Sequence, residues 1–188
     1  MNFKEYLLTP YGIITAICVI LYALPFVFGI NPMLLNSLGW KDNSAIADGQ
    51  WYRLISSIFL HGSFWHIMLN MYSLYNIGPT VKNIFDYTGQ NGNMAFITIF
   101  LVSGICGSLA SYYFTANPSL GASGAIFGLM GAMTAFAVLK NETEMLQSIM
   151  FIFAINVFYG FTTAGIDNSA HFGGFIGGII AGLILILV

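Results

Sequence analysis

The chain has 188 residues, of which 57% are hydrophobic and 6% are charged, and its formal net charge is -2. A soluble domain typically carries about 25% charged residues, so this chain cannot cover its surface with polar groups in water. Its mean hydropathy of +0.81 indicates an integral, multi-pass membrane protein. The composition offers no basic patch, which excludes a nucleic-acid-binding function.

Apolar runs between the charged residues predict an all-α domain, residues 1–188, that is a bundle of six transmembrane helices, because about 20 apolar residues cross a bilayer. The predicted spans are about 11–30, 54–77, 94–114, 123–139, 145–163 and 169–188. The uncharged stretch from Tyr87 to Leu139 is too long for one helix, and residues 115–122, with Asn-Pro and Gly, predict the break. Residues 31–52, which include the amphipathic sequence MLLNSLGW, are expected to form a first loop in the membrane interface.

The basic residues give a weak indication of orientation. With six spans both termini lie on one side, together with Lys4, Lys82 and Lys140, whereas Lys41 and Arg53 lie on the other. The excess of three over two predicts cytoplasmic termini under the positive-inside rule.

The three histidines, His61, His66 and His171, all fall in or at the ends of predicted spans. Ionisable groups are costly there and mark function or an internal partner. His66 and Asn70 are four residues apart and share a helical face. His61 would lie about 140° around the same helix from His66 and is expected to serve a different surface.

Small residues form a seam on each of two predicted spans. The seam of the last span consists of His171, Gly174, Gly178 and Gly182. The seam of the fourth span consists of Gly124, Gly128, Gly131 and Ala135, with Ser123 at its N-terminal edge. Such seams let helix backbones approach closely, so two facing seams would bring His171 near Ser123.

These residue types are those of acyl-transfer chemistry. A serine becomes a nucleophile when a base lies within hydrogen-bond reach, and the developing oxyanion needs donors. The N–H of Ser123 belongs to the first turn of its helix and has no partner inside it, and His66 and Asn70 would add side-chain donors. Two simpler interpretations remain open: Ser123 is a small packing residue, and His66 and Asn70 hydrogen-bond between helices.

Four sequence elements together resemble the rhomboid intramembrane serine proteases. They are GASG around Ser123, Ala170-His171 with Gly-Gly after it, the series His61, His66 and Asn70, and Trp51-Tyr52-Arg53, which is similar to the family's W-x-R element. The resemblance extends from Trp51 to Gly178.

The resemblance implies a role for each matching residue. Ser123 would be the nucleophile and His171 the general base, in a dyad without the carboxylate of a triad. The oxyanion hole would consist of His66, Asn70 and the backbone N–H of Ser123. Phe127 would lie against the His171 ring. The remaining residues would support the site, as packing glycines or as interfacial anchors: Gly121, Gly124, Gly174, Gly178, Arg53 and Trp51.

The family cleaves other membrane proteins within or beside a transmembrane helix, so the implied partners are transmembrane protein substrates and the lipid bilayer. The fifth span and residues 158–168 would be a mobile gate and cap. The resemblance implies no cofactor, no metal and no obligate protein partner. A six-span core resembles prokaryotic members, so a bacterial cytoplasmic membrane is expected.

The sequence favours this function over three alternatives. A non-catalytic relative that binds transmembrane helices would typically lack the serine or the histidine. A small transporter would show inverted repeats or paired broken helices, which the sequence lacks. A zinc protease would need His-Glu-x-x-His, but His61 and His66 enclose no glutamate.

Overall fold

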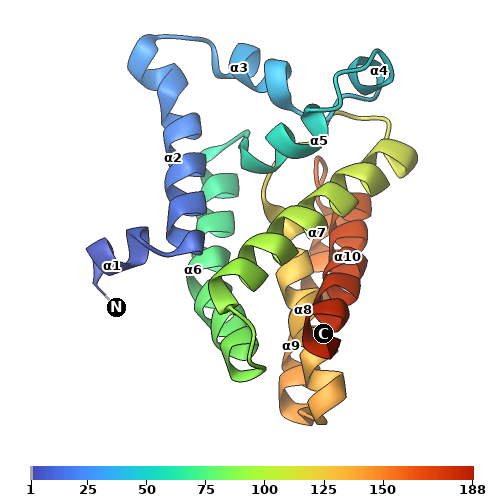
Figure 1. The fold of residues 1–188 in the computed structure, drawn as a ribbon. Coiled ribbons are helices and arrows are strands. Elements are labelled where there is room, and N and C mark those ends of the chain that lie inside the picture. Colours follow the sequence, from blue (N-terminus) through green and yellow to red (C-terminus); the bar gives the residue numbers. More distant parts are fainter. Residues whose placement is uncertain (1) are drawn as a thin grey trace.

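The computed structural model describes residues 2–188, so Met1, the first residue of the predicted domain, lies outside the described part. All regular elements of residues 2–188 are helices, accompanied by one isolated antiparallel bridge between Lys41 and Ser119. Six long helices form the bundle in Figure 1: α2 (Pro10–Phe28), α6 (Phe64–Tyr87), α7 (Gly92–Phe114), α8 (Ser123–Lys140), α9 (Thr143–Thr162) and α10 (Asn168–Leu187). The predicted all-α membrane bundle is confirmed.

Five of these helices, α2 and α7 to α10, are long and apolar enough to cross a membrane. Their ends lie within about two residues of the predicted spans. Helix α6 has 24 residues, which is more than enough length, but it carries more polar side chains. It runs beside α2 in the bundle (Figure 1), and we treat it as the sixth spanning helix.

The predicted second span, 54–77, is wrong by ten residues at each end. The helix begins only at Phe64, because the hydroxyl of Ser63 caps it by accepting from the His66 N–H at 3.2 Å. Before it lie two short helices, α5 (Arg53–Ser56) and the 3₁₀ turn η1 (Ser57–Phe59). Three apolar residues that led to the prediction of a span here are buried within the protein: Leu54, Ile58 and Leu60.

The first loop folds into short helices. They are α3 (Pro32–Gly39) and α4 (Asn43–Ala47), followed by α5. Three apolar side chains of α3 are largely exposed: Met33, Leu34 and Leu38. This face suits the predicted interfacial position, which stays a prediction. The sequence did not predict the small helix α1 (Phe3–Leu7), which a capping box of Asn2 and Glu5 begins.

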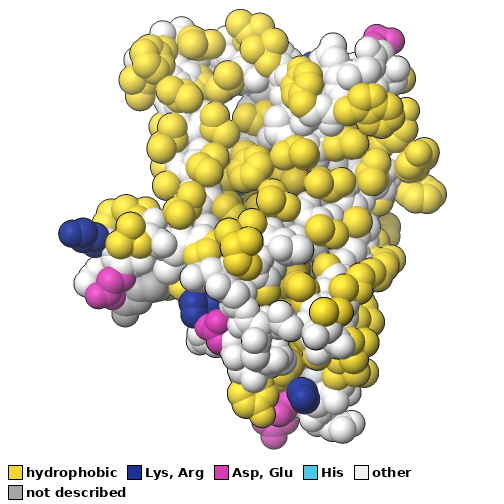
Figure 2. All heavy atoms as spheres, viewed as in Figure 1, with side chains coloured by type: hydrophobic (Ala, Val, Ile, Leu, Met, Phe, Trp, Pro, Cys, Tyr) yellow, Lys and Arg dark blue, Asp and Glu magenta, His cyan; other side chains and the backbone are white. Residues whose placement is uncertain are grey.

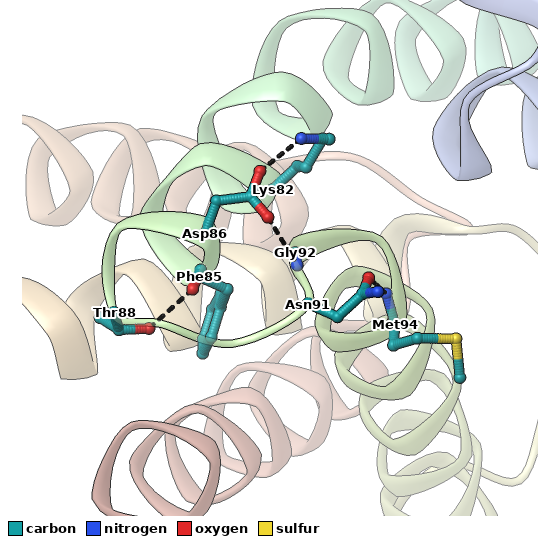
Figure 3. Close-up of polar contacts among 7 residues, drawn as sticks. All are labelled: Lys82, Phe85, Asp86, Thr88, Asn91, Gly92 and Met94. Atoms are coloured by element: carbon teal, nitrogen blue, oxygen red, sulfur yellow. Dashed lines mark hydrogen bonds and ion pairs between the residues drawn. The ribbon is translucent and has the colours of Figure 1, made fainter.

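On the face shown in Figure 2 hydrophobic side chains predominate, and the few charged side chains lie mostly in the lower half, with one acidic group at the upper end. The turn from α6 to α7 belongs to the lower end in Figure 1. There the Asp86 carboxylate accepts from the Lys82 ammonium and from the Gly92 N–H at 2.8 Å, which closes the turn (Figure 3). Both termini also lie toward this end, and the first loop lies at the other (Figure 1).

Candidate active site

Ser123 stands at the junction of an irregular loop and a helix. Residues 115–122 lead to it, and α8 begins at Ser123 itself. Gly121 has a φ of 125°, which side chains other than glycine rarely adopt, and its N–H donates to the Ser57 carbonyl at 2.9 Å. The backbone N–H groups of the first turn, including that of Ser123, have no partner within the helix and are available as donors.

His171 lies in the first turn of α10 and is 7% exposed. The Asp167 carboxylate caps this helix by accepting from the Ala170 N–H at 3.1 Å. The His171 Nε2 lies 2.9 Å from the Ser123 Oγ, which is hydrogen-bond distance. The two residues that the sequence placed on separate spans are therefore in direct contact.

The small-residue seams explain how two helices come so close. A Cβ added to Gly174 or Gly178 would collide with the backbone of Gly124 or Gly128, respectively. A Cβ on Gly182 would lie 2.8 Å from the Cα of Ala132. Helices α8 and α10 thus pack with their backbones in contact, as the seams predicted.

A second seam, between α10 and α7, was not predicted. A Cβ on Gly173 would lie 2.8 Å from the Cys106 carbonyl oxygen, and one on Gly177 would lie 2.7 Å from the Cys106 Cβ. Helix α10 is therefore fixed on two sides. The spacing of Gly173 and Gly177 is the signal that could have revealed it.

An aromatic ring lies flat against the imidazole. The rings of Phe127 and His171 are parallel within 5°, with their centroids 4.2 Å apart. The other ring nitrogen, Nδ1, is buried and has no hydrogen-bond partner among residues 2–188. No carboxylate orients the ring in the manner of a triad, so its plane is set by packing against Phe127.

His66 and Asn70 lie on one face of α6, beside the loop that leads to Ser123. A Cβ added to Gly121 would lie 2.5 Å from the His66 Nε2, so the imidazole touches the loop backbone. The Asn70 amide donates one N–H to the His66 carbonyl at 2.9 Å and retains a second.

The helical geometry from which His61 was expected to serve a different surface from His66 is absent, although of the two only His66 lines the cavity beside Ser123. Helix α6 begins after His61, so the helical angle does not apply. Its ring lies edge-on to that of His66, with the centroids 5.1 Å apart.

A cavity of about 550 Å³ joins these groups, and Ser123, His171, His66 and Asn70 all line it. Its far wall comes from α9, through Asn156 and Tyr159, and from residues 163–167. The cavity can hold an extended segment of peptide beside the serine. Residues 2–188 contain no group of three His, Cys, Asp or Glu side chains placed to hold a metal ion.

Arg53 and Trp51 lie away from the serine. Arg53 is buried and donates to the carbonyls of Ser37 at 2.9 Å and Trp40 at 3.0 Å, which ties α5 to the end of α3. Trp51 is 58% exposed. Their role as interfacial anchors stays a prediction.

Two charged side chains that line the cavity, the buried Lys41 and the half-buried Asp167, were not among the predicted site residues. Burial lowers the pKa of Lys41, and the negative charges of Asp167 and Asp42 oppose that shift. Burial alone would raise the pKa of Asp167, but hydrogen bonds from Ser111, Ala170 and two other donors outweigh it and hold the pKa below its usual value. A lysine in a loop gives no sign in sequence that it is buried.

Comparison with known proteins identifies the family of this chain. The Rhomboid domain family model matches residues 48–188. Rhomboid protease GluP of Bacillus subtilis is 41% identical over 155 residues, which is 80% of this chain and 29% of that protein. RHOMBOID-like protein 5 of Arabidopsis thaliana is 38% identical over 161 residues, covering 81% of this chain and 50% of that protein.

A shorter relative, the putative rhomboid protease YdcA of Bacillus subtilis, is 31% identical over 153 residues, or 75% of this chain and 73% of that protein. The chain spans half or less of GluP and RHOMBOID-like protein 5. The family model nevertheless covers the helices that carry Ser123, His171, His66 and Asn70. The chain belongs to the rhomboid family and is an integral, multi-pass membrane protein.

Proposed function

We propose that the chain is an intramembrane serine endopeptidase that uses Ser123 and His171 as a catalytic dyad. The observation that carries the proposal is the 2.9 Å separation of Ser123 Oγ and His171 Nε2 within the cavity. A serine with a base at this distance can lose its proton as it attacks a carbonyl carbon. Family membership and relatives named as proteases support the same activity.

The reaction then proceeds through two acyl-transfer steps. Ser123 Oγ attacks the peptide carbonyl while His171 Nε2 takes its proton, and the imidazolium returns that proton to the leaving amine. Water, deprotonated by His171, then attacks the acyl carbon, the bond to Ser123 Oγ breaks, and the imidazolium returns the proton to Oγ as the carboxylic acid product is released. The Ser123 N–H, His66 and Asn70 are the donors closest to the developing oxyanion in this scheme.

The substrates are transmembrane segments of other membrane proteins. A peptide bond in a helix is shielded by the helix's own hydrogen bonds, so the segment must unwind before its carbonyl reaches Ser123. Helix α9 and residues 163–167 border the cavity and are positioned to act as gate and cap. We place the protein in a bacterial cytoplasmic membrane with cytoplasmic termini, which follows from the positive-inside count and the prokaryotic resemblance.

The dyad is tested with purified protein in liposomes and a labelled single-span substrate. Ser123→Ala and His171→Ala should each lower cleavage by at least about 10³-fold, because members of such a unit are not redundant. A fluorophosphonate should label the wild type at Ser123 and leave Ser123→Ala unlabelled. Thermal unfolding in detergent shows whether each variant is folded.

Cleavage that survives either substitution would refute the dyad. A folded wild type that neither cleaves nor labels, but captures the substrate, would instead identify a non-catalytic relative. A protein that moves solutes across the liposome membrane without cleaving would support a transporter.

A further inference from the structure

Two charged side chains bind the end of α7 outside the dyad: Lys41, which is buried, and Asp167, which is half-buried. Lys41 belongs to the first loop and is 1% exposed. Asp167 precedes α10 and caps it. They are 126 positions apart in the chain, yet both bind the segment that runs from Ser111 to the loop before Ser123.

Lys41 binds three backbone carbonyl groups at the end of α7 and in the loop that follows it. Its ammonium donates to the carbonyls of Thr115 at 2.9 Å, Asn117 at 2.8 Å and Ser111 at 3.4 Å. Ser111 lies in the last turn of α7, and its carbonyl also accepts from the Thr115 N–H at 2.9 Å. Thr115 follows the helix as its C-cap, and its carbonyl also accepts from the Asn43 amide at 3.1 Å. A cation at a helix C-terminus is also favoured by the helix dipole.

The backbone of Lys41 holds the same loop further along. Lys41 and Ser119 exchange two backbone hydrogen bonds, of 2.8 and 3.0 Å. Ser119 lies four residues before Ser123, and Gly121 between them is tied to Ser57. The irregular loop that presents the nucleophile therefore takes much of its shape from one buried lysine.

Asp167 binds the same end of α7 through hydroxyl groups. Its carboxylate accepts from Ser111 Oγ and, at 3.1 Å, from Thr115 Oγ1. It also accepts from the Ala170 N–H, one residue before His171. The carbonyls of Ser111 and Thr115 thus accept from Lys41, and their hydroxyls donate to Asp167.

We propose that Lys41 and Asp167 are positioning residues, which hold the loop before Ser123 and the first turn of α10 in one fixed relation through the end of α7. The two halves of the dyad come from separate chain segments, and the network joins the segments on which they stand. The expected effect of these residues on kcat rests on the proposed function. Their expected effect on the positions of the two chain segments does not. Misplacing a reacting group by about 1 Å can lower a rate by about 10²-fold.

The test compares Lys41→Met with Lys82→Met, which removes a partly exposed lysine from the turn in Figure 3. Lys41→Met should lower kcat for the labelled substrate by about 10- to 100-fold and leave KM within about twofold. Amide hydrogen exchange in residues 115–123 should rise about tenfold, with exchange in α2 unchanged. Lys82→Met should match the wild type, and Lys41→Arg should recover part of the lost kcat.

A second variant guards against a Lys41→Met protein that fails to fold. Ser111→Ala with Thr115→Val removes the hydroxyl groups that reach Asp167 and keeps every carbonyl that reaches Lys41. It should raise exchange at residues 167–171 and lower kcat in the same way. Asp167→Asn, which retains a cap, should do so less than Asp167→Ala.

Two results would overturn the proposal: unchanged kcat and exchange in these variants, or a fall in kcat that only follows the loss of folded protein. A wild type that does not cleave would remove the proposed function alone. The exchange measurements would then still decide whether Lys41 and Asp167 hold the two segments.

Discussion

His171 is oriented by a ring and not by a charge. In a Ser-His-Asp triad a carboxylate accepts from the second imidazole nitrogen and fixes the tautomer. Here that nitrogen, Nδ1, has no partner among residues 2–188, and Phe127 covers one face of the ring. Phe127 is itself packed edge-on against Phe153 of α9, with the ring centroids 5.7 Å apart. Orientation of the base therefore depends on aromatic packing that extends to the outermost helix.

The proposed oxyanion donors, His66 and Asn70, can be tested one residue at a time. Loss of one donor to an oxyanion typically lowers kcat by about 10²–10³-fold, so His66→Ala and Asn70→Ala should each have an effect of that size. KM should change little, because the bond forms only in the transition state. The measurement is the steady-state rate of substrate cleavage in liposomes.

Asn76 provides the matched control for Asn70. It stands on the same helix and its amide donates to the Tyr72 carbonyl at 2.7 Å, as that of Asn70 donates to His66, but its side chain is exposed. Asn76→Ala should leave kcat unchanged. Equal losses in Asn70→Ala and Asn76→Ala would mean that the amide stabilises α6 and does not bind the oxyanion.

At the scale of helices, the sequence predicted the contact in which the backbones of α8 and α10 approach closely. Glycine at every fourth position marks a contact surface whatever lies opposite, so the seams of α8 and α10 could be matched without a structure. The contact of Ser123 with His171 followed from that match. The roles of these residues remain predictions.

The start of α6 could not be predicted in the same way. Residues 54–60 contribute to an apolar run like that of a span, but Leu54, Ile58 and Leu60 are buried in protein, and hydropathy does not distinguish protein from lipid. Ser63 fixes the start of α6 by capping it, but a serine at this position is not a distinctive sequence signal. Lys41 was missed for a related reason, since its partners are backbone carbonyls, which carry no sequence signal.

The seam between α8 and α10 should be intolerant of a single methyl group. In Gly178→Ala the new Cβ would meet the backbone of Gly128, which cannot move aside as a side chain can, so the two helices must separate. Such overpacking typically lowers the free energy of unfolding by about 1–3 kcal/mol. Separation also moves His171 from Ser123, so fluorophosphonate labelling should slow at temperatures where the variant is folded.

Gly62→Ala is the comparison for this experiment. A Cβ at Gly62 would make only an ordinary contact, 3.7 Å from Leu120 Cδ1. Its thermal unfolding should equal that of the wild type. A Gly178→Ala protein with wild-type stability and labelling would show that the contact between α8 and α10 tolerates an added methyl group, contrary to this prediction.

Across the whole molecule, burial is distributed unevenly around the cavity. In the most apolar stretch of α8, 72% of the residues are buried, compared with 28% in α2 and 11% in α9. Helix α8 is the centre of the bundle and carries the serine, whereas α9 borders the cavity from outside. Few buried contacts mean a low free energy of local opening, which is what a gate requires.

Local opening of α9 can be measured by hydrogen exchange in detergent. We expect amides of α9 to exchange at least about tenfold faster than those of α8, because fewer buried contacts oppose opening. Labelling Ser123 with a fluorophosphonate fills the cavity that Asn156 and Tyr159 line, and should slow exchange in α9. Helix α2 is the control, since it is also largely exposed but does not line this cavity. If labelling slows α2 as much as α9, the effect is a general stabilisation, and α9 has no special link to the site.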